Sequence, residues 1–351
     1  MWGSVKNSSD AGIFVHKAKN GDIVIADIYV DDAMWLGNNQ ALVKKLMTRF
    51  TDRWESRVIG DLTNGGPSRE FLSLQIKRIG SLIFIDQNPY CKKILARFGM
   101  ENARKQETPL PLNYSPFANK EKVDPELRTK YQQLIGSLLY LMIGTRPDIA
   151  FAVIKMASFS ANPSQQHYKD ALSILKYLAG TQNTRLHFNG ATNKGIDCHS
   201  DSDWASDPNT RRSCSGYYVK LAGATIMWTS RLQKTVALSS TEAEYMAMSD
   251  ACRQAMWFLS LFQEISFNIT SIPVTGDNMG SLFMGKNPVT EKRSKHIDIW
   301  YHYIQEIIAA GHMETFFIEG TNNPADILTK NLGRIFFTKY RAELGLEILI
   351  T

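Results

Sequence analysis

Residues 200–247, SDSDWASDPNTRRSCSGYYVKLAGATIMWTSRLQKTVALSSTEAEYMA, contain the pattern that decides the fold. Alternating apolar side chains predict strands at GYYVKLAG and ATIMWTS, and the periodicity of residues 241–264 predicts a long helix. Further along, strand and helix patterns alternate until NPADILTK, residues 323–330, which we expect to open a final helix. Strands that come first and then alternate with helices are typical of a mixed sheet covered by helices.

Four carboxylates stand in four separate parts of this pattern. Asp201 lies in a predicted strand, Glu244 near the start of the long helix, Asp277 at the end of IPVTGD, and Asp326 in NPADILTK. Acidic groups that converge in one fold repel one another unless cations lie between them. Carboxylate oxygens are the ligands that Mg²⁺ prefers, and two such ions can hold a scissile phosphate. The sequence therefore predicts a two-metal centre for phosphodiester hydrolysis.

The acidic residues around Asp201 also have a structural interpretation. Asp201 and Asp203 are two residues apart, so in a strand both side chains face the same way and both could reach one metal. Asp203 or Asp207 could instead fix a turn, because the stretch SDPNT is rich in turn residues. We favour Asp201 as the ligand and Asp203 as a turn residue.

The other three carboxylates have ordinary alternatives as well. A Glu at a helix start is usually a cap, and the overlapping words SSTE and TEAE both match a capping box. We expect Glu242 to be the cap, because Glu244 lies at the end of an apolar stripe and needs a partner such as a cation. Asp277 could cap the next helix, and Asp326 could interact with a helix dipole. The full set of four, in this order, has no such explanation.

This region and the words KHIDIWYHYIQE and NNPADILTK resemble the ribonuclease H domain at the end of copia-type retrotransposon polyproteins. The resemblance covers residues 184–345. It implies an enzyme, a nuclease that hydrolyses the RNA strand of RNA/DNA hybrids. It also implies that two Mg²⁺ ions, or Mn²⁺ in their place, are bound by Asp201, Glu244, Asp277 and Asp326. Many ribonucleases H carry a mobile histidine shortly before the last aspartate, but none lies between Glu314 and Asp326, and we do not assign that role to His312.

Several polar residues are candidate contacts to the nucleic acid. Discrimination of RNA requires contacts to 2′-hydroxyls, for which we consider three residues near the carboxylates: Ser240, Thr241 and Asn278. Phosphates could be met by basic residues, namely Arg211, Arg212, Lys292, Arg293 and Lys295. The alternative for any single basic residue is a solvated charged face.

Residues 13–112 resemble the last part of a copia-type reverse transcriptase. IYVDDAMWLG carries the YVDD word, and QNPYCKKILARFGMENARKQETPLP and LIGSLLYLMIGTRPDIAFAV agree as well. The resemblance implies a hairpin that brings Asp31 and Asp32 to polymerase metals. The family places a further essential aspartate well upstream, whereas only 28 residues precede Tyr29 here. We therefore expect no polymerase activity unless a missing segment or another chain completes the site, and we expect an exposed sheet edge beside this hairpin.

These patterns predict a fold of the α+β and α/β classes in three parts. Residues 1–115 are expected to form a truncated reverse-transcriptase palm with the start of a thumb-like region. The proline-rich stretch 107–120 reads as a linker, and residues 116–183 as a helical connection region. Residues 184–345 are expected to form a ribonuclease H-like domain with a mixed sheet.

Composition narrows the class of protein and its ligand. The 351 residues carry a net charge of +6, from 40 basic and 34 acidic residues. Residues 1–120 hold 17 basic and 12 acidic side chains, whereas residues 191–351 hold 15 and 17. Because phosphate neutralisation supplies much of the affinity for nucleic acids, we expect the basic first half to provide most of the grip. The four cysteines have no zinc-ligand spacing, and no apolar run is long enough for a membrane span, so we expect an intracellular protein of the cytoplasm or nucleus without a membrane partner.

Three functional hypotheses follow. The first is a metal-dependent ribonuclease attached to an incomplete polymerase. The second is a non-catalytic nucleic-acid-binding or vestigial remnant of a copia-type element. The third is an active reverse transcriptase completed by another chain. Cleavage of a hybrid separates the first two hypotheses, and primer extension tests the third.

Overall fold

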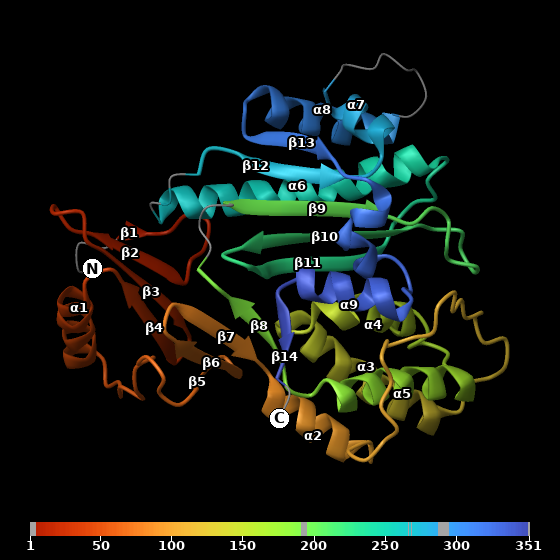
Figure 1. Cartoon of the computed structure of the whole chain (residues 1–351), viewed down its shortest axis with the longest axis horizontal. Coiled ribbons are helices and arrows are strands. Elements are labelled where there is room, and N and C mark those ends of the chain that lie inside the picture. The colour runs from red at the N-terminus through yellow and green to blue at the C-terminus, as the bar shows by residue number, and fades with distance from the viewer. Residues whose placement is uncertain (1–4, 191–194, 266, 268, 287–294, 350–351) are drawn as a thin grey trace.

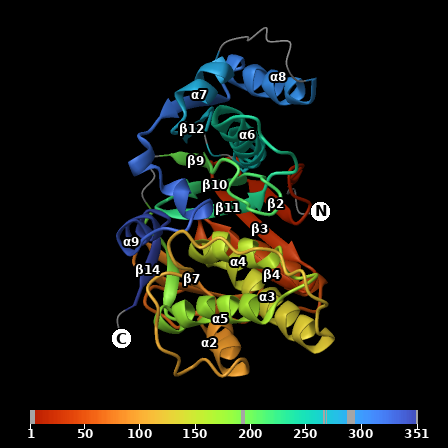
Figure 2. The ribbon, with the colours of Figure 1, turned by 90° about the vertical axis from the view of Figure 1, so that its right-hand side faces the viewer.

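The computed structural model describes residues 5–190, 195–265, 267, 269–286 and 295–349, with three sheets and the helices around them (Figure 1). Helices lie at both ends of the molecule. Helices α7 (Met279–Lys286) and α8 (Lys295–Ala309) lie at one end, and α2 (Asn88–Arg97) lies at the other (Figures 1 and 2). No described helix is long and apolar enough to cross a membrane.

The first sheet is antiparallel and contains the YVDD hairpin. Its strands stand in chain order, β1 (Val5–Lys6), β2 (Ile13–Lys17), β3 (Ile23–Tyr29) and β4 (Asp32–Gly37), and α1 (Gln40–Arg53) packs beside β4. Strands β3 and β4 form the hairpin that we expected around Asp31 and Asp32. Among the described residues β4 pairs only with β3, which leaves β4 as an edge of the sheet, as expected from the sequence.

A second sheet joins distant parts of the chain. The hairpin of β6 (Leu74–Ile79) and β7 (Leu82–Asp86) carries β5 (Arg69–Phe71) on one side. On its other side β7 pairs with β8 (Thr184–Phe188), and β8 pairs with β14 (Leu346–Ile348). This sheet fastens the first third of the chain to its last strand.

A helical layer follows the proline-rich linker. It lies within the region 116–183 that we expected to be helical, and it consists of α3 (Pro125–Gly144), the short 3₁₀ turn η1 (Pro147–Ile149), α4 (Ala150–Ala157) and α5 (Gln165–Gly180). The linker has no helix or strand, yet Leu110 is buried in the helical core. An ion pair inside this layer joins Arg146 Nη2 to Asp148 Oδ2 at 2.8 Å, and the Tyr177 hydroxyl donates to the same oxygen at 2.5 Å.

The third sheet holds the candidate site. Its strand order is β11-β10-β9-β12-β13, with three antiparallel strands followed by two that run parallel to β9. Tyr217 belongs to the core under the long helix α6 (Ser240–Glu264), whereas its neighbour Tyr218 belongs to the core shared with the helical layer. The sheet is thus covered on both faces. The strands are β9 (Ile196–Ser202), β10 (Cys214–Leu221), β11 (Ala224–Leu232), β12 (Ile272–Gly276) and β13 (Met313–Phe317).

This strand order and the helix after the third strand form a ribonuclease H-like fold, so the predicted fold class is confirmed. One predicted element is wrong. NPADILTK does not open the final helix: residues Pro324–Leu328 form a 3₁₀ turn, η3, after a shorter one, η2 (Gly320–Asn322), and α9 begins only at Arg334. The turn ends at Thr329, whose φ of −126° is not helical, and Gly333 is the N-cap of α9.

Candidate active site

Asp201 lies near the end of β9, where the 3₁₀ turn η3 approaches the sheet. Its partner in β10 is Gly216, where an added Cβ would lie 2.7 Å from side-chain atoms of Leu328 and Thr329. Only glycine allows η3 this close to the sheet. The buried Asn323 fixes the approach, since its Nδ2 donates to the Ser200 carbonyl at 3.0 Å. η3, which contains Asp326, is thereby held close to the strand that contains Asp201.

Glu244 belongs to the buried face of α6. Ser239 is the N-cap, because its side chain accepts from the Glu242 amide at 3.1 Å. The Glu242 carboxylate accepts from the Leu238 amide at 2.9 Å, so Glu242 caps the helix as predicted. Glu244 is only 8% exposed. The side chain of Gln233 fastens this end of α6 to the sheet, donating at 3.0 Å to the Ala243 carbonyl and at 2.9 Å to Ser215.

Asp277 directly follows β12, which runs parallel to β9 and beside it. The cap of α7 is Asn278, whose Oδ1 accepts from the Ser281 amide at 2.9 Å. The alternative interpretation of Asp277 as a helix cap is therefore wrong. The register pairs Thr275 with His199, so the residues after β12 lie next to the end of β9 that carries Asp201.

The structure brings three of the four carboxylates together. One oxygen each of Asp201, Glu244 and Asp277 lies within 4.8 Å of the others, the only such group of metal-ligating side chains among the described residues. Asp201 is 0% exposed, and its Oδ1 has no hydrogen-bond partner. A buried carboxylate oxygen without a donor is costly unless a cation meets it. Asp326 lies on the other side of Asp201, bound to Lys330.

Burial and mutual repulsion raise the pKa of these acids. Burial, followed by the charges of Asp201 and Asp277, raises the pKa of Glu244 to about 10. Burial and the Asp201 charge also raise the pKa of Asp277, and that of Asp326 to about 7. Burial alone lowers the pKa of Lys330, but the adjacent Asp201 and Asp326 outweigh it and raise the pKa. The centre thus holds more negative charge than it can keep without cations.

Three residues of the centre were not identified from the sequence. The Thr329 hydroxyl donates to Asp201 Oδ2. The Lys330 Nζ lies 2.7 Å from Asp326 Oδ1 and 3.5 Å from Asp201 Oδ2. At Gly320 an added Cβ would lie 3.0 Å from Asp277 Oδ2. The four-residue spacing of Asp326 and Lys330 is a signal that could have revealed the lysine; no local pattern marks Gly320.

The candidate contacts to a 2′-hydroxyl lie near Asp277. Thr241 and Asn278 meet across Gly280, where an added Cβ would lie 3.1 Å from side-chain atoms of both. Ser240 is the exposed first residue of α6. The side chain of Asn278 is already used in part, because its Oδ1 caps α7.

The candidate phosphate contacts are placed only in part. Arg211 and Arg212 lie in the turn after β9, where Asp207 Oδ2 accepts from the Thr210 amide at 3.0 Å. Within the described residues neither arginine forms an ion pair with the four carboxylates. Lys292 and Arg293 lie outside the described residues, as does the side chain of Lys295, the first residue of α8.

Asp203 and Asp207 fix the loop between β9 and β10. The Asp203 carboxylate accepts from the Cys214 amide and from the Ser206 hydroxyl, and burial raises its pKa to about 6. Asp207 closes the turn at Thr210. Both side chains therefore have the turn role that we preferred for Asp203, and neither belongs to the group of three carboxylates.

The YVDD hairpin forms a separate acidic tip. Tyr29 pairs with Asp32, and the turn between them places Val30 at φ 52°, a left-handed conformation that is strained for a β-branched residue. Asp31 and Asp32 are exposed. Within the described residues, no third metal-ligating side chain joins these two in a cluster.

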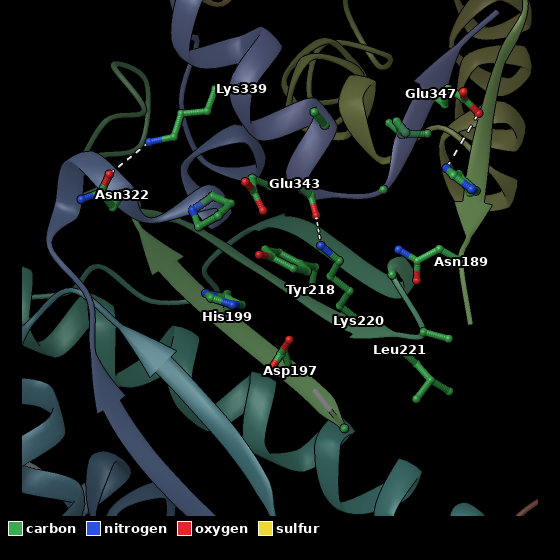
Figure 3. Close-up of a pocket in the computed structure, with 18 of the residues that line it drawn as sticks. Asn189, Asp197, His199, Tyr218, Lys220, Leu221, Asn322, Lys339, Glu343 and Glu347 are labelled. Atoms are coloured by element: carbon green, nitrogen blue, oxygen red, sulfur yellow. Dashed lines mark hydrogen bonds and ion pairs between the residues drawn. The ribbon is translucent and has the colours of Figure 1, made fainter. Parts of the chain in front are cut away.

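A cavity of about 640 Å³ lies between the sheet and the last helix, and none of the four carboxylates lines it (Figure 3). His199 faces it, stacked on Tyr218 with ring centroids 5.0 Å apart, and burial lowers the pKa of this histidine to about 4. Beside Tyr218 on the same strand, Lys220 Nζ donates to the Glu343 carbonyl at 2.6 Å (Figure 3). His312 lies at the far end of β13 from Asp277, because Met313 pairs with Ile272 at the start of β12. Neither histidine is placed as a partner of the carboxylates.

Comparison with known proteins places the sequence among transposon proteins. No family model matches the chain. It is 32% identical to the "Retrovirus-related Pol polyprotein from transposon TNT 1-94" of Nicotiana tabacum, over 98% of this chain and 26% of that protein. It is 33% identical to the "Retrovirus-related Pol polyprotein from transposon RE1" of Arabidopsis thaliana, over 98% and 23%. The chain thus spans about a quarter of the length of these relatives.

Shorter proteins and solved structures are also similar to the chain. The mitochondrial protein AtMg00810 of Arabidopsis thaliana is 31% identical over 66% of this chain and 92% of its own length. LC11-RNase H1, solved in complex with an RNA/DNA hybrid, is 18% identical, covers 38% of this chain and has a TM-score of 0.29, with 93% of that protein covered. The foamy viral protease-reverse transcriptase, solved with double-stranded DNA, is 13% identical over 84% of this chain and 55% of its own, with a TM-score of 0.45.

Proposed function

Because the chain belongs to the retrovirus-related Pol polyproteins of transposons, we propose that residues 184–345 form a ribonuclease H that hydrolyses the RNA strand of RNA/DNA hybrids. One observation carries this proposal. Oxygens of Asp201, Glu244 and Asp277 lie within 4.8 Å of one another, and the buried Oδ1 of Asp201 has no hydrogen-bond partner. This arrangement suits hard divalent cations with oxygen ligands.

The residues of the centre fit two Mg²⁺ or Mn²⁺ ions. Asp201, Glu244 and Asp277 would hold one ion, and Asp201 with Asp326 would hold the other. Bound there, divalent cations supply Lewis acidity at a phosphate and lower the pKa of a bound water. Because burial and the neighbouring carboxylates raise the pKa of Glu244 and Asp277, a cation that binds there would release the Glu244 proton.

The chain's own side chains position the reacting groups. Thr329 holds Asp201 through its hydroxyl, and Asn323 fixes the turn that carries Asp326. Thr241 and Asn278 lie against each other at Gly280, beside Asp277, where they could donate to the 2′-hydroxyl of the cut strand. The basic residues of the first half would hold the phosphates of the hybrid.

We also propose three parts of the chain: a palm-like part at residues 1–115, a helical connection at 116–183 and a ribonuclease H-like domain at 184–345. We further propose that the palm-like part does not polymerise by itself. Asp31 and Asp32 are exposed, and within the described residues no further metal-ligating side chain joins them. A partner segment or chain with a third carboxylate would be needed, so primer extension by this chain alone would contradict this part of the proposal. The four buried free cysteines suit the intracellular location that we include in it.

Cleavage of an end-labelled RNA/DNA hybrid in Mg²⁺ tests the nuclease. We expect cleavage of the RNA strand alone, loss of cleavage in EDTA, and loss in Asp277→Asn with the fold retained. Asp250→Asn is the matched control, because this carboxylate on α6 binds Arg231 and Arg253 away from the centre. A folded protein that binds the hybrid and cuts neither strand would favour the non-catalytic alternative, a nucleic-acid-binding remnant.

A further inference from the structure

Lys330 places a fixed positive charge inside the carboxylate centre. Its Nζ lies 2.7 Å from Asp326 Oδ1 and 3.5 Å from Asp201 Oδ2, so it bridges the first and last carboxylates. The lysine side chain is 39% exposed, whereas the side chain of Asp201 is 1% exposed. The ammonium group is thus reachable from solvent while the oxygen that it neutralises is not.

The two oxygens of Asp201 have different surroundings. Oδ2 accepts a hydrogen bond from Thr329 and lies 3.5 Å from Lys330 Nζ, whereas Oδ1 has no hydrogen-bond partner. The Asp201 carboxylate also lies in one group with Glu244 and Asp277. Within the described residues no basic side chain forms an ion pair with Glu244 or Asp277, although the Lys330 charge acts on both from farther away. We call the edge formed by Asp201, Glu244 and Asp277 the open edge. The other edge of the centre, between Asp201 and Asp326, already holds the Lys330 ammonium group.

We propose that Lys330 is a built-in counter-ion of the Asp201–Asp326 edge, and that the two divalent cations therefore bind unequally. The first binds the open edge and leaves Lys330 in place. The second binds only by displacing the ammonium group from Asp326. This inference rests on the proposed metal centre and concerns how that centre is filled.

The fold allows this displacement at little structural cost. Lys330 follows η3 on a flexible four-carbon side chain, and its contacts in the centre are the two carboxylates. Asn323 and Gly216, not the lysine, fix η3 to the sheet. An ion that displaces the ammonium group breaks an ion pair and leaves the turn in place.

Mn²⁺ binding measures the inequality without reference to catalysis. We would count bound Mn²⁺ by electron paramagnetic resonance in the full chain, in Lys330→Met and in Lys339→Met. Lys339 is the matched control, since its Nζ donates to the neutral Asn322 side chain at 3.0 Å in the same part of the chain. We expect two sites in the unmodified chain, the second at least about tenfold weaker. Lys330→Met should tighten the second site about tenfold and leave the first unchanged, whereas Lys339→Met should change neither.

The outcomes separate this inference from the proposed function. No Mn²⁺ binding by a folded, unmodified chain overturns the metal centre and this inference with it. Two sites that Lys330→Met does not alter, or that Lys339→Met alters equally, overturn the inference alone. A second measurement adds Mg²⁺ to the unmodified chain and follows its ¹⁵N-lysine signals by nuclear magnetic resonance, so that variants are needed only to assign the Lys330 signal. The Lys330 signal, assigned by its loss in Lys330→Gln or Lys330→Arg, should move with the second ion and not with the first; a shift complete at the first ion contradicts the displacement.

Discussion

Replacing Glu244 with glutamine is expected to make the metal-free protein more stable at neutral pH, although it removes a proposed metal ligand. Burial and the charges of Asp201 and Asp277 raise the pKa of Glu244 from 4.5 to about 10. At pH 7 the folded chain therefore holds a proton on Glu244 that the unfolded chain does not bind. Glutamine has nearly the shape of the protonated acid and needs no proton.

The expected size of the effect follows from this difference in pKa. Each pH unit between the unfolded and the folded pKa lowers the free energy of unfolding by about 1.36 kcal/mol. From 4.5 to pH 7 this is roughly 2.5 units, or about 3 kcal/mol, a large part of the stability of a domain. Since the folded pKa is raised, the loss is absent below pH 4.5 and grows as the pH rises toward about 10.

Urea unfolding in EDTA, at pH values from about 4 to about 8, measures this difference. The Glu244→Gln curve should separate from that of the unmodified chain as the pH rises, and Mg²⁺ should stabilise the unmodified chain more than the variant. Glu242→Gln is the matched control on the same helix, with an expected loss of at most about 1 kcal/mol from a weaker cap. If Glu244→Gln is less stable than the unmodified chain in EDTA at pH 7, the three carboxylates do not repel one another as described.

Three further predictions concern the surroundings of the centre. Gly216→Ala should lower stability by about 1–3 kcal/mol, measured by urea unfolding, and reduce hybrid cleavage, because its Cβ would displace Leu328. Unchanged stability together with full cleavage would contradict the close approach of η3 to the sheet. Asp148→Ala should lower stability by about 3–5 kcal/mol by leaving the buried Arg146 unpaired, and an unchanged unfolding curve would show that this pair is not buried. Val30→Gly should raise the stability of the palm-like part by about 1 kcal/mol, because glycine adopts the left-handed backbone conformation of residue 30 without strain. Hydrogen exchange of the β3 and β4 amides should then be slower, and faster exchange would argue against the strain.

The periodic elements could be predicted because their signal is local. The alternation in GYYVKLAG and the long stripe of α6 correspond to β10 and α6 with boundaries within a few residues. The four acidic motifs, in their order along the chain, predicted one carboxylate centre, and three of its residues form a compact group: Asp201, Glu244 and Asp277. Glu242 as the cap also follows from sequence, because two capping-box spacings overlap there and only Glu244 lies on the apolar stripe of the helix.

The errors and omissions arise where distant segments meet. We expected NPADILTK to open a helix, but η3 packs against Gly216 of the sheet and ends at Thr329. The role of Lys330 as the partner of Asp201 depends on a contact between residues more than a hundred positions apart. No local pattern records that contact, and the same holds for Gly320 beside Asp277.

The sheet that joins β7, β8 and β14 bears on the order in which the chain folds. It pairs Ile83 with Phe188 and Leu186 with Leu346, so its strands come from the first third, the middle and the last part of the described chain. Contacts between such distant residues are slow to form, because a long loop must close before any of them is gained. During synthesis one edge of β7 stays unpaired until β8 has been made, and one edge of β8 then stays unpaired until β14 has been made. This interval is the one in which a nascent chain is most exposed to mispairing with a neighbour.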